Sequence, residues 1–308
     1  MTSMKKARAF RSKRSLIFYI GILALPITQF LIFYIYVNAN SIFLAFKEID
    51  SLDFKKYTLT LKNFTNWFVD ENENAKLVRA VKVSLKSYAI TVCISVPFGL
   101  FFSYYIAKRM RGALFFRMML FLPSIISSIV LATIYRYFLH NVVPEILGKM
   151  DVTLKHTNLI DYKGTRYAFL MVYNLFVGFG TNVLLYSNKM STISPELSEA
   201  AGLDGANSFQ EFFHIVLPQV FSTVSVFLVA GIAGIFTNEL NNFSFYNYKT
   251  YSNTTTVGFL MFYKIQNAKN RVNLYPPLAA LGIMISAVII PATFIVKKLF
   301  DKFGPSED

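Results

Sequence analysis

The chain has 308 residues, of which 54% are hydrophobic, and its mean hydropathy of +0.44 excludes an ordinary soluble domain of that length. The formal net charge of +14 is spread over tails and loops without a nucleic-acid motif, so anionic lipid headgroups explain it better than nucleic acid. Cys93 is the only cysteine, and the three histidines lack metal-ligand spacing, so neither an intrachain disulfide nor a metal site is predicted.

Six stretches carry no charged residue and approach or exceed the length that crosses a bilayer. About 20 helical residues span roughly 30 Å of hydrocarbon. The stretches are 15–37, 87–107, 118–135, 167–188, 215–238 and 272–296. The third is the shortest and is expected to extend past Arg136, whose long side chain can snorkel. We therefore predict an all-α integral membrane protein with six transmembrane helices in a single domain, 1–308.

Basic residues are densest in the N-terminal tail, 1–14, and in the short loop between the second and third stretches, 108–117. Basic charges in the first tail and in short loops weigh most in setting membrane topology. Placing both clusters in the cytoplasm predicts that both termini are inside. The cytoplasmic parts are then the basic tail 1–14, the loop 189–214 and the tail 297–308.

Polar residues interrupt the fourth stretch at helical spacing. Asn174, Gly178 and Thr181 fall at i, i+4 and i+7 and therefore share one helix face. Polar groups within a span are costly unless they face a water-filled path or a partner. Asn174 and Thr181 offer donors and acceptors to a hydroxyl-rich ligand, although packing against a partner helix would satisfy Asn174 equally well. Aromatic residues that neighbour this face are expected to pack against such a ligand: Tyr173, Phe176 and Phe179.

The loop 189–214 and the start of the fifth stretch contain the pattern E-A-A, three residues, G, nine residues, I-x-L-P. Its filled positions are Glu199, Ala200, Ala201, Gly205, Ile215, Leu217 and Pro218. Ser194, followed by a proline and an acid, predicts a helix start, and Gly202 is the expected helix end. The turn residues that follow precede a predicted capping box of Ser208 and Glu211. This predicts helix, tight turn and helix, leading into the membrane.

The end of the fifth stretch is rich in polar residues, with the run IFTNELNNF at 235–243. If the helix continues, Ile235, Glu239 and Asn242 share one face. The alternative is that Glu239 and Asn241 lie at the outer interface, wetted by extracellular water. Serine and threonine residues earlier in this span are expected to support helix packing: Ser222, Thr223 and Ser225.

The pattern from Glu199 to Pro218 resembles the loop by which permease subunits of binding-protein-dependent ABC importers dock onto their ATPase subunits. The segment ISPELSEAAGLDGA resembles its sugar-permease form, with Ser194 before the proline. The runs LTLKNF at 59–64 and FRMMLFLP at 116–123 resemble further elements of carbohydrate-type permeases. The resemblance implies the type I ABC importer permease fold. It implies ATPase coupling by Glu199, Ala200, Ala201, Asp204, Gly205, Ile215, Leu217 and Pro218.

The same resemblance implies a substrate path, because maltose-type permeases use an asparagine and a glycine at positions matching Asn174 and Gly178. The proline usual two residues later is replaced by Gly180, which leaves the local helix geometry open. The asparagine-rich end of the fifth stretch is also similar to the maltose-type permeases. The residues expected along the path are Asn174, Gly178, Thr181, Glu239 and Asn242.

The implied function is that of a non-catalytic permease subunit in the bacterial cytoplasmic membrane, which moves a sugar or oligosaccharide inward. No G-x-x-x-x-G-K-[ST] occurs, so ATP and Mg²⁺ are expected on two separate ATPase subunits. A second homologous permease and an extracytoplasmic solute-binding protein complete the expected partners. A permease for an amino acid, peptide or polyamine would share the docking loop. A stand-alone channel or carrier would have no use for that loop.

Overall fold

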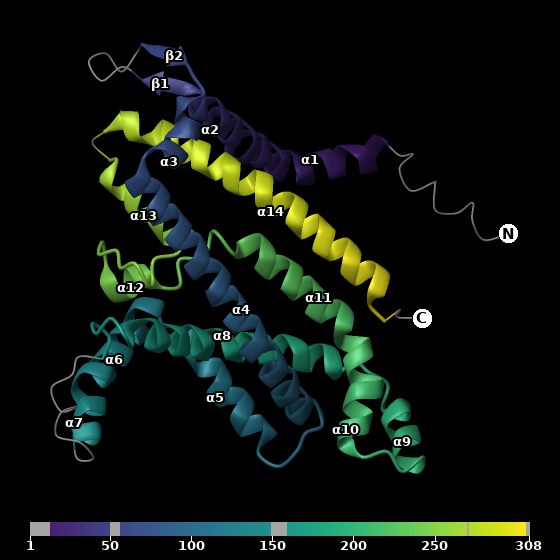
Figure 1. Ribbon diagram of the computed structural model, residues 1–308. Helices are drawn as coiled ribbons and strands as arrows, with labels where there is room; N and C mark the ends of the chain where they lie inside the picture. Colours follow the sequence, from purple (N-terminus) through teal and green to yellow (C-terminus); the bar gives the residue numbers. More distant parts are fainter. Residues whose placement is uncertain (1–12, 50–55, 149–158, 270, 306–308) are drawn as a thin grey trace. The chain divides into compact units, whose positions relative to one another are not determined.

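The computed structural model describes residues 13–49, 56–148, 159–269 and 271–305, and these residues are mostly helical (Figure 1). The tail before residue 13 and His156 lie outside the described residues. The chain divides into a smaller compact unit, Met1–Trp67 with Ala268–Met284, and a larger one, Phe68–Asn267 with Ile285–Asp308.

The smaller unit begins with a long apolar helical run in which, from residue 16 on, Ala45 is the one buried residue. Its segments are α1 (Lys13–Gln29), the π-helical η2 (Phe30–Tyr36) and α2 (Val37–Ala45). An antiparallel hairpin of β1 (Lys47–Ile49) and β2 (Tyr57–Leu59) follows, with Glu48 opposite Thr58. A hydrogen bond joins the two chain segments of this unit: the Trp67 indole of α3 (Lys62–Val69) donates to the Pro277 carbonyl at 2.8 Å. Pro277 lies in the first turn of α14 (Tyr275–Phe303), which is preceded by η6 (Val272–Leu274).

The larger unit is built on α4 (Glu71–Ala107), which packs along α8 (Arg166–Met190). Asp70 caps α4, because its carboxylate accepts from the backbone N–H groups of Asn72 and Glu73. The remaining elements are α5 (Ala113–Ile125), α6 (Ser128–Tyr137), η3 (Phe138–Val142), α7 (Val143–Gly148), α9 (Pro195–Leu203), α10 (Ser208–Glu211), η5 (Phe212–Val216), α11 (Leu217–Gly234), α12 (Asn242–Tyr246), α13 (Val257–Asn267) and the end of α14.

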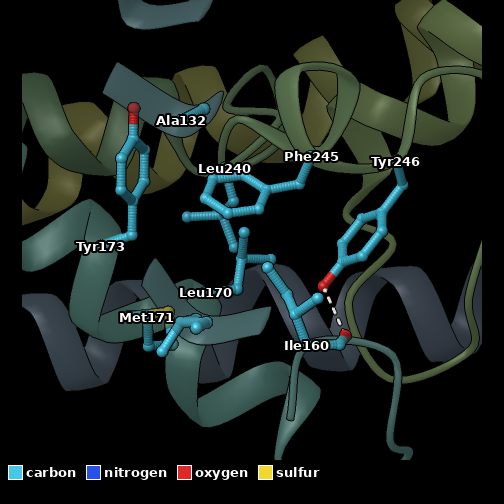
Figure 2. Close-up of a cluster of buried hydrophobic side chains, with 9 residues drawn as sticks. Ala132, Ile160, Leu170, Met171, Tyr173, Leu240, Phe245 and Tyr246 are labelled. Carbon is cyan, nitrogen blue, oxygen red and sulfur yellow. Dashed lines mark hydrogen bonds between the residues drawn. The ribbon is translucent and has the colours of Figure 1, made fainter. Parts of the chain in front are cut away.

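Two clusters of buried side chains hold the larger unit together. The first joins α6, α8 and α12 around Leu170, Tyr173 and Phe245 (Figure 2). Within this cluster the Tyr246 hydroxyl donates to the Ile160 carbonyl. The second cluster joins α4, α8, η5 and α11, and includes Leu100, Tyr186, Met190, Phe212, Val216, Val220 and Val224. Close packing of these side chains orders the helices through van der Waals contacts, because within a bilayer the lipid tails are as apolar as the side chains themselves.

Among the described residues, five helices are long and apolar enough to cross a membrane: Leu16–Ala45, Glu71–Ala107, Arg166–Met190, Ser208–Gly234 and Val272–Phe303. A sixth candidate is a pair, Ala113–Ile125 and Ser128–Ile146, bent by 102°. The expected continuous third span is therefore wrong at Ile126, which is extended and ends α5 before Ser127 starts the next helix. The helix after the break does continue past Arg136, as expected. The fifth span ends at Gly234 rather than at 238.

Candidate functional site

The first helix of the predicted docking loop is α9. Ser194 lies at its N-cap and Pro195 in its first turn, as the sequence indicates, but the Ser194 side chain makes no capping hydrogen bond. The predicted end at Gly202 is wrong, because the helix continues to Leu203 and Asp204 is its C-cap. Gly202 is thus an ordinary helical residue, and the glycine needed to end the helix is Gly205.

Gly205 ends α9 in the geometry that favours glycine. Its φ is +78°, in the left-handed region. The Ala206 N–H donates to the Ala201 carbonyl at 2.9 Å, and the Gly205 N–H donates to the Gly202 carbonyl at 3.1 Å. These two bonds form a Schellman motif with Gly205 at its left-handed position. The glycine of the pattern is therefore explained by backbone conformation, since a Cβ added there meets no described atom within 4 Å.

The second helix of the loop begins one residue earlier than expected. The capping box uses Asn207 and Gln210: the Asn207 side chain accepts from the Gln210 N–H, and the Gln210 side chain accepts from the Asn207 N–H. The predicted box of Ser208 and Glu211 is therefore wrong. The π-helical η5 follows and precedes Pro218, which has no N–H to donate into a continuous α-helix.

Glu211 does not take part in the capping box. It lies instead at the centre of a polar cluster, hereafter the Glu211 cluster. Its carboxylate accepts from the Ser198 hydroxyl of α9 at 2.7 Å and from the Tyr104 hydroxyl of α4 at 2.9 Å. The Lys108 ammonium lies 2.5 Å from the same carboxylate. Glu211 is itself buried. One carboxylate thus ties both helices of the loop to the end of α4.

The docking pattern divides into an exposed part and a supporting part. Glu199, Ala200, Asp204 and Gly205 are exposed, and α9 lies beside α10 at one end of the larger unit (Figure 1). Ala201 is buried, and the three residues of the I-x-L-P end are half-buried: Ile215, Leu217 and Pro218. Sequence reasoning missed Leu203, whose side chain is 90% exposed at the tip of α9. The available signal was a large apolar residue placed directly before turn residues.

On α8, the structure gives Asn174 hydrogen-bond partners within this chain. Its amide nitrogen donates to the carbonyls of Leu170 and Leu240, at 2.8 and 3.0 Å. Its oxygen accepts from the Asn241 amide at 2.8 Å. Asn174 therefore holds the turn that follows α11. Both of its amide hydrogens are used in these bonds, while its oxygen can accept one further hydrogen bond. A role for Asn174 in transport stays a prediction.

The other two residues of the predicted α8 face are exposed. Gly178 and Thr181 are exposed, and a Cβ at Gly178 would meet no described atom within 4 Å. Tyr173 is not exposed beside them, because it is buried in the first cluster (Figure 2). Its hydroxyl donates to the Ser128 carbonyl. At Gly180, a Cβ would lie 1.8 Å from the Leu120 carbonyl oxygen, so this glycine lets α5 approach α8 closely while α8 remains unbroken.

The face proposed for Ile235, Glu239 and Asn242 does not exist, because α11 ends at Gly234 and α12 starts at Asn242. The chain turns between them, with Leu240 and Asn241 at φ values of 52° and 54°. Asn242 is only 1% exposed, and its amide donates to the Glu239 and Thr254 carbonyls. Glu239 is half-buried, and this burial raises the pKa of its carboxyl.

Comparison with known proteins identifies relatives that are transport permeases. The multiple sugar-binding transport system permease protein MsmF of Streptococcus mutans is 22% identical over 256 residues, covering 78% of this chain and 87% of that protein. The probable ABC transporter permease protein YesP of Bacillus subtilis is 29% identical over 220 residues, covering 70% and 68%. The maltose/maltodextrin permease MalF of Escherichia coli is 27% identical over 187 residues. That match covers 59% of this chain and only 36% of MalF.

Among solved structures, this chain is similar to a chain of a bacterial ABC transporter involved in the import of the acidic polysaccharide alginate. The TM-score is 0.79 with 21% identity, covering 94% of this chain and 97% of the other. This likeness confirms the predicted permease fold. The family model described as "Binding-protein-dependent transport system inner membrane component" matches residues 95–303, about two thirds of the chain, and confirms the predicted membrane location. The chain therefore belongs to the family of inner membrane components of binding-protein-dependent transport systems.

Proposed function

We propose that this chain is the permease subunit of an ATP-driven importer for a sugar or oligosaccharide. The observation that carries the proposal is the complete docking pattern, folded as an exposed helix whose tip residue, Leu203, is 90% exposed. A single exposed leucine is common on protein surfaces, so the proposal rests on the complete pattern and not on Leu203 alone. Relatives named as sugar and maltose permeases support the choice of solute.

The docking loop is proposed to bind one of two separate ATPase subunits, which hold ATP and Mg²⁺. Glu199 and Asp204 offer carboxylates beside the apolar tip of Leu203, so the complementary ATPase surface is an apolar cleft with basic or polar groups. Movement of α9 would pass to α4 through the Glu211 cluster, because Ser198 and Tyr104 bind the same carboxylate. Closure of the ATPase pair would thereby turn the substrate path from outward-facing to inward-facing.

A second homologous permease and a solute-binding protein are proposed as the other partners. The alginate transporter was solved in complex with an alginate pentasaccharide-bound periplasmic protein, and its chain matches this one with a TM-score of 0.79 at 20% identity. In the predicted orientation the segments 38–86 and 239–271 lie outside the cell, and each is proposed to contact such a protein; residues 50–55 and 270 lie outside the described residues. The exposed α8 residues Gly178 and Thr181 are proposed to line the path beside Asn174.

Uptake by reconstituted complex tests the proposal. The chain, its partner permease, the ATPase and the binding protein are placed in proteoliposomes and given radiolabelled maltose, sucrose, raffinose, trigalacturonate, glutamine, a dipeptide and spermidine. We expect ATP-dependent uptake of a saccharide, and its loss when Leu203→Glu places a charge in the apolar cleft. Uptake confined to the amino acid, dipeptide or polyamine would assign another solute class. Uptake that needs no ATP would refute the importer assignment.

A further inference from the structure

A cavity of about 450 Å³ lies inside the larger unit, bounded by α4, α8, α11 and the turn that follows α11. Small-molecule sites commonly have volumes of about 300–1,000 Å³, so the space suits a ligand. The α8 residues that line the cavity are Asn182 and Tyr186, and the predicted path residues of α8 do not line it. Asn182 lies four residues after Gly178, so the cavity borders the predicted path face on α8. The two places still differ in their residues, because Asn174, Gly178 and Thr181 do not line the cavity.

The walls of the cavity are uncharged and mainly apolar, with hydroxyl and amide groups set among the apolar side chains. From α4, Ser84, Ser87, Thr91 and Ser95 recur every three or four residues and line one side of the cavity. The Ser84 hydroxyl accepts from the Val257 N–H, and the Ser87 hydroxyl is hydrogen-bonded to that of Tyr167, so these two are partly engaged within the chain. The Asn182 amide donates to the Ser95 hydroxyl at 3.2 Å, which leaves the amide oxygen to accept from a ligand. None of the residues that line it, within the described part of the chain, is Asp, Glu, Lys, Arg or His.

Aromatic rings complete the wall. The Tyr88 hydroxyl donates to the Leu228 carbonyl at 2.9 Å, which holds the ring in place. Tyr186 packs edge-on against Phe227, with ring centroids 5.7 Å apart. Flat apolar rings beside hydroxyl and amide groups match a saccharide, which presents C–H faces and a rim of hydroxyls. A charged solute is disfavoured, because it would lose hydration without gaining an opposite charge.

We propose that this cavity binds a neutral saccharide unit, as a site separate from the predicted α8 path. The inference rests on the proposed function and narrows the substrate class to uncharged sugars. The turn after α11 connects the two places: Asn238 and Leu240 line the cavity, while the Leu240 carbonyl and Asn241 bind Asn174. A saccharide in the cavity thus contacts the same turn that Asn174 holds.

Cysteine protection tests occupancy in the assembled complex. Cys93 is changed to serine, and Thr91→Cys then places a single thiol on the cavity wall, where the uncharged reagent N-ethylmaleimide can reach it. The probes are maltose, sucrose, raffinose and trigalacturonate. We expect the neutral saccharide that the complex transports to slow labelling of Thr91→Cys at least fivefold. Trigalacturonate should give no protection. The matched control, Thr181→Cys, reports on the path face.

The outcomes separate this inference from the proposed function. Uptake of a neutral saccharide without protection of Thr91→Cys overturns the cavity site and leaves the importer in place. Uptake of trigalacturonate alone also overturns it, while preserving a sugar importer. Failure to transport any saccharide removes the proposed function and, with it, the inference.

A volume change provides an independent measurement. Gly234 lines the cavity, and a Cβ built there meets no described atom within 4 Å, so a larger side chain fits without displacing backbone. Gly234→Leu should fill part of the space and raise the KM for uptake of the transported neutral saccharide several-fold. Gly21→Leu is the matched control, because Gly21 is a helical glycine with equally open surroundings in α1. An unchanged KM in Gly234→Leu would argue against a saccharide in the cavity.

Discussion

Replacement of Glu211 should uncouple ATP hydrolysis from transport. Its carboxylate joins Ser198 of α9 to Tyr104 of α4 and to Lys108, which directly follows α4. Glu211→Ala removes the common acceptor, so α9 is no longer tied to α4 through it. The ATPase would still bind the exposed tip of α9, but movement of that helix would reach α4 less completely. We expect fewer saccharide molecules transported per ATP hydrolysed.

The size of the effect follows from the lost contacts. A hydrogen bond to a charged group contributes about 1.5–3 kcal/mol, and two part-buried hydroxyls lose such a bond. The Lys108 side chain is 34% exposed, so solvent screens its charge and its contribution is small. With partial compensation by water, attachment of α9 should weaken by about 2–4 kcal/mol. That is a shift of about 30- to 900-fold in the attachment equilibrium.

The assay compares saccharide uptake and ATP hydrolysis in the same proteoliposomes. Glu211→Gln keeps the shape and one acceptor oxygen, so it should recover part of the coupling that Glu211→Ala loses. The exposed Glu145 of α7 provides the matched control, Glu145→Gln, which should behave as the parent. A Glu211→Ala complex with the parental ratio of uptake to hydrolysis would refute the role of the cluster.

Further substitutions probe the turn, the path and the pH response. Gly205→Ala should cost roughly 1–2 kcal/mol through its left-handed φ and weaken copurification of the ATPase, and Gly205→Asp more so; full copurification would count against the loop. Asn174→Ala should lower uptake while the subunit still inserts, and parental uptake would make Asn174 purely structural. Asn242→Ala should instead destabilise the folded complex by about 1–3 kcal/mol, because removal of the buried amide leaves the carbonyls of Glu239 and Thr254 without this donor. An unchanged melting temperature would contradict this. Burial raises the pKa of the Glu239 carboxyl, because the charged form loses hydration in the folded state. The contribution of the protonated carboxyl to folding stability is fully present below the ordinary pKa of 4.5. That contribution is lost as pH rises through the raised pKa, and Glu239→Gln should flatten the dependence in thermal unfolding.

Local chemistry made much of the fold predictable. Apolar stretches without charge located the membrane helices, because the hydrocarbon core excludes charge and sets a minimum helix length. Pro195 and Gly205 predicted the start of α9 and the turn after it, since each restricts or permits particular backbone angles. Helix ends were less accurate: the capping box begins at Asn207 rather than Ser208. Neighbouring residues with similar side chains compete for a cap, and only the folded backbone selects one.

By itself, then, the sequence determined the family, the apolar spans and the docking helix, all of which depend on composition or on residues close together in the chain. Only the tertiary structure decided which polar side chains have hydrogen-bond partners within the chain. Asn174 binds Leu240 and Asn241 more than sixty positions away, and Glu211 meets Tyr104 across more than a hundred. The physical reason is that burial and hydrogen-bond partners depend on which helices pack together, and helical spacing records only the face on which a residue lies.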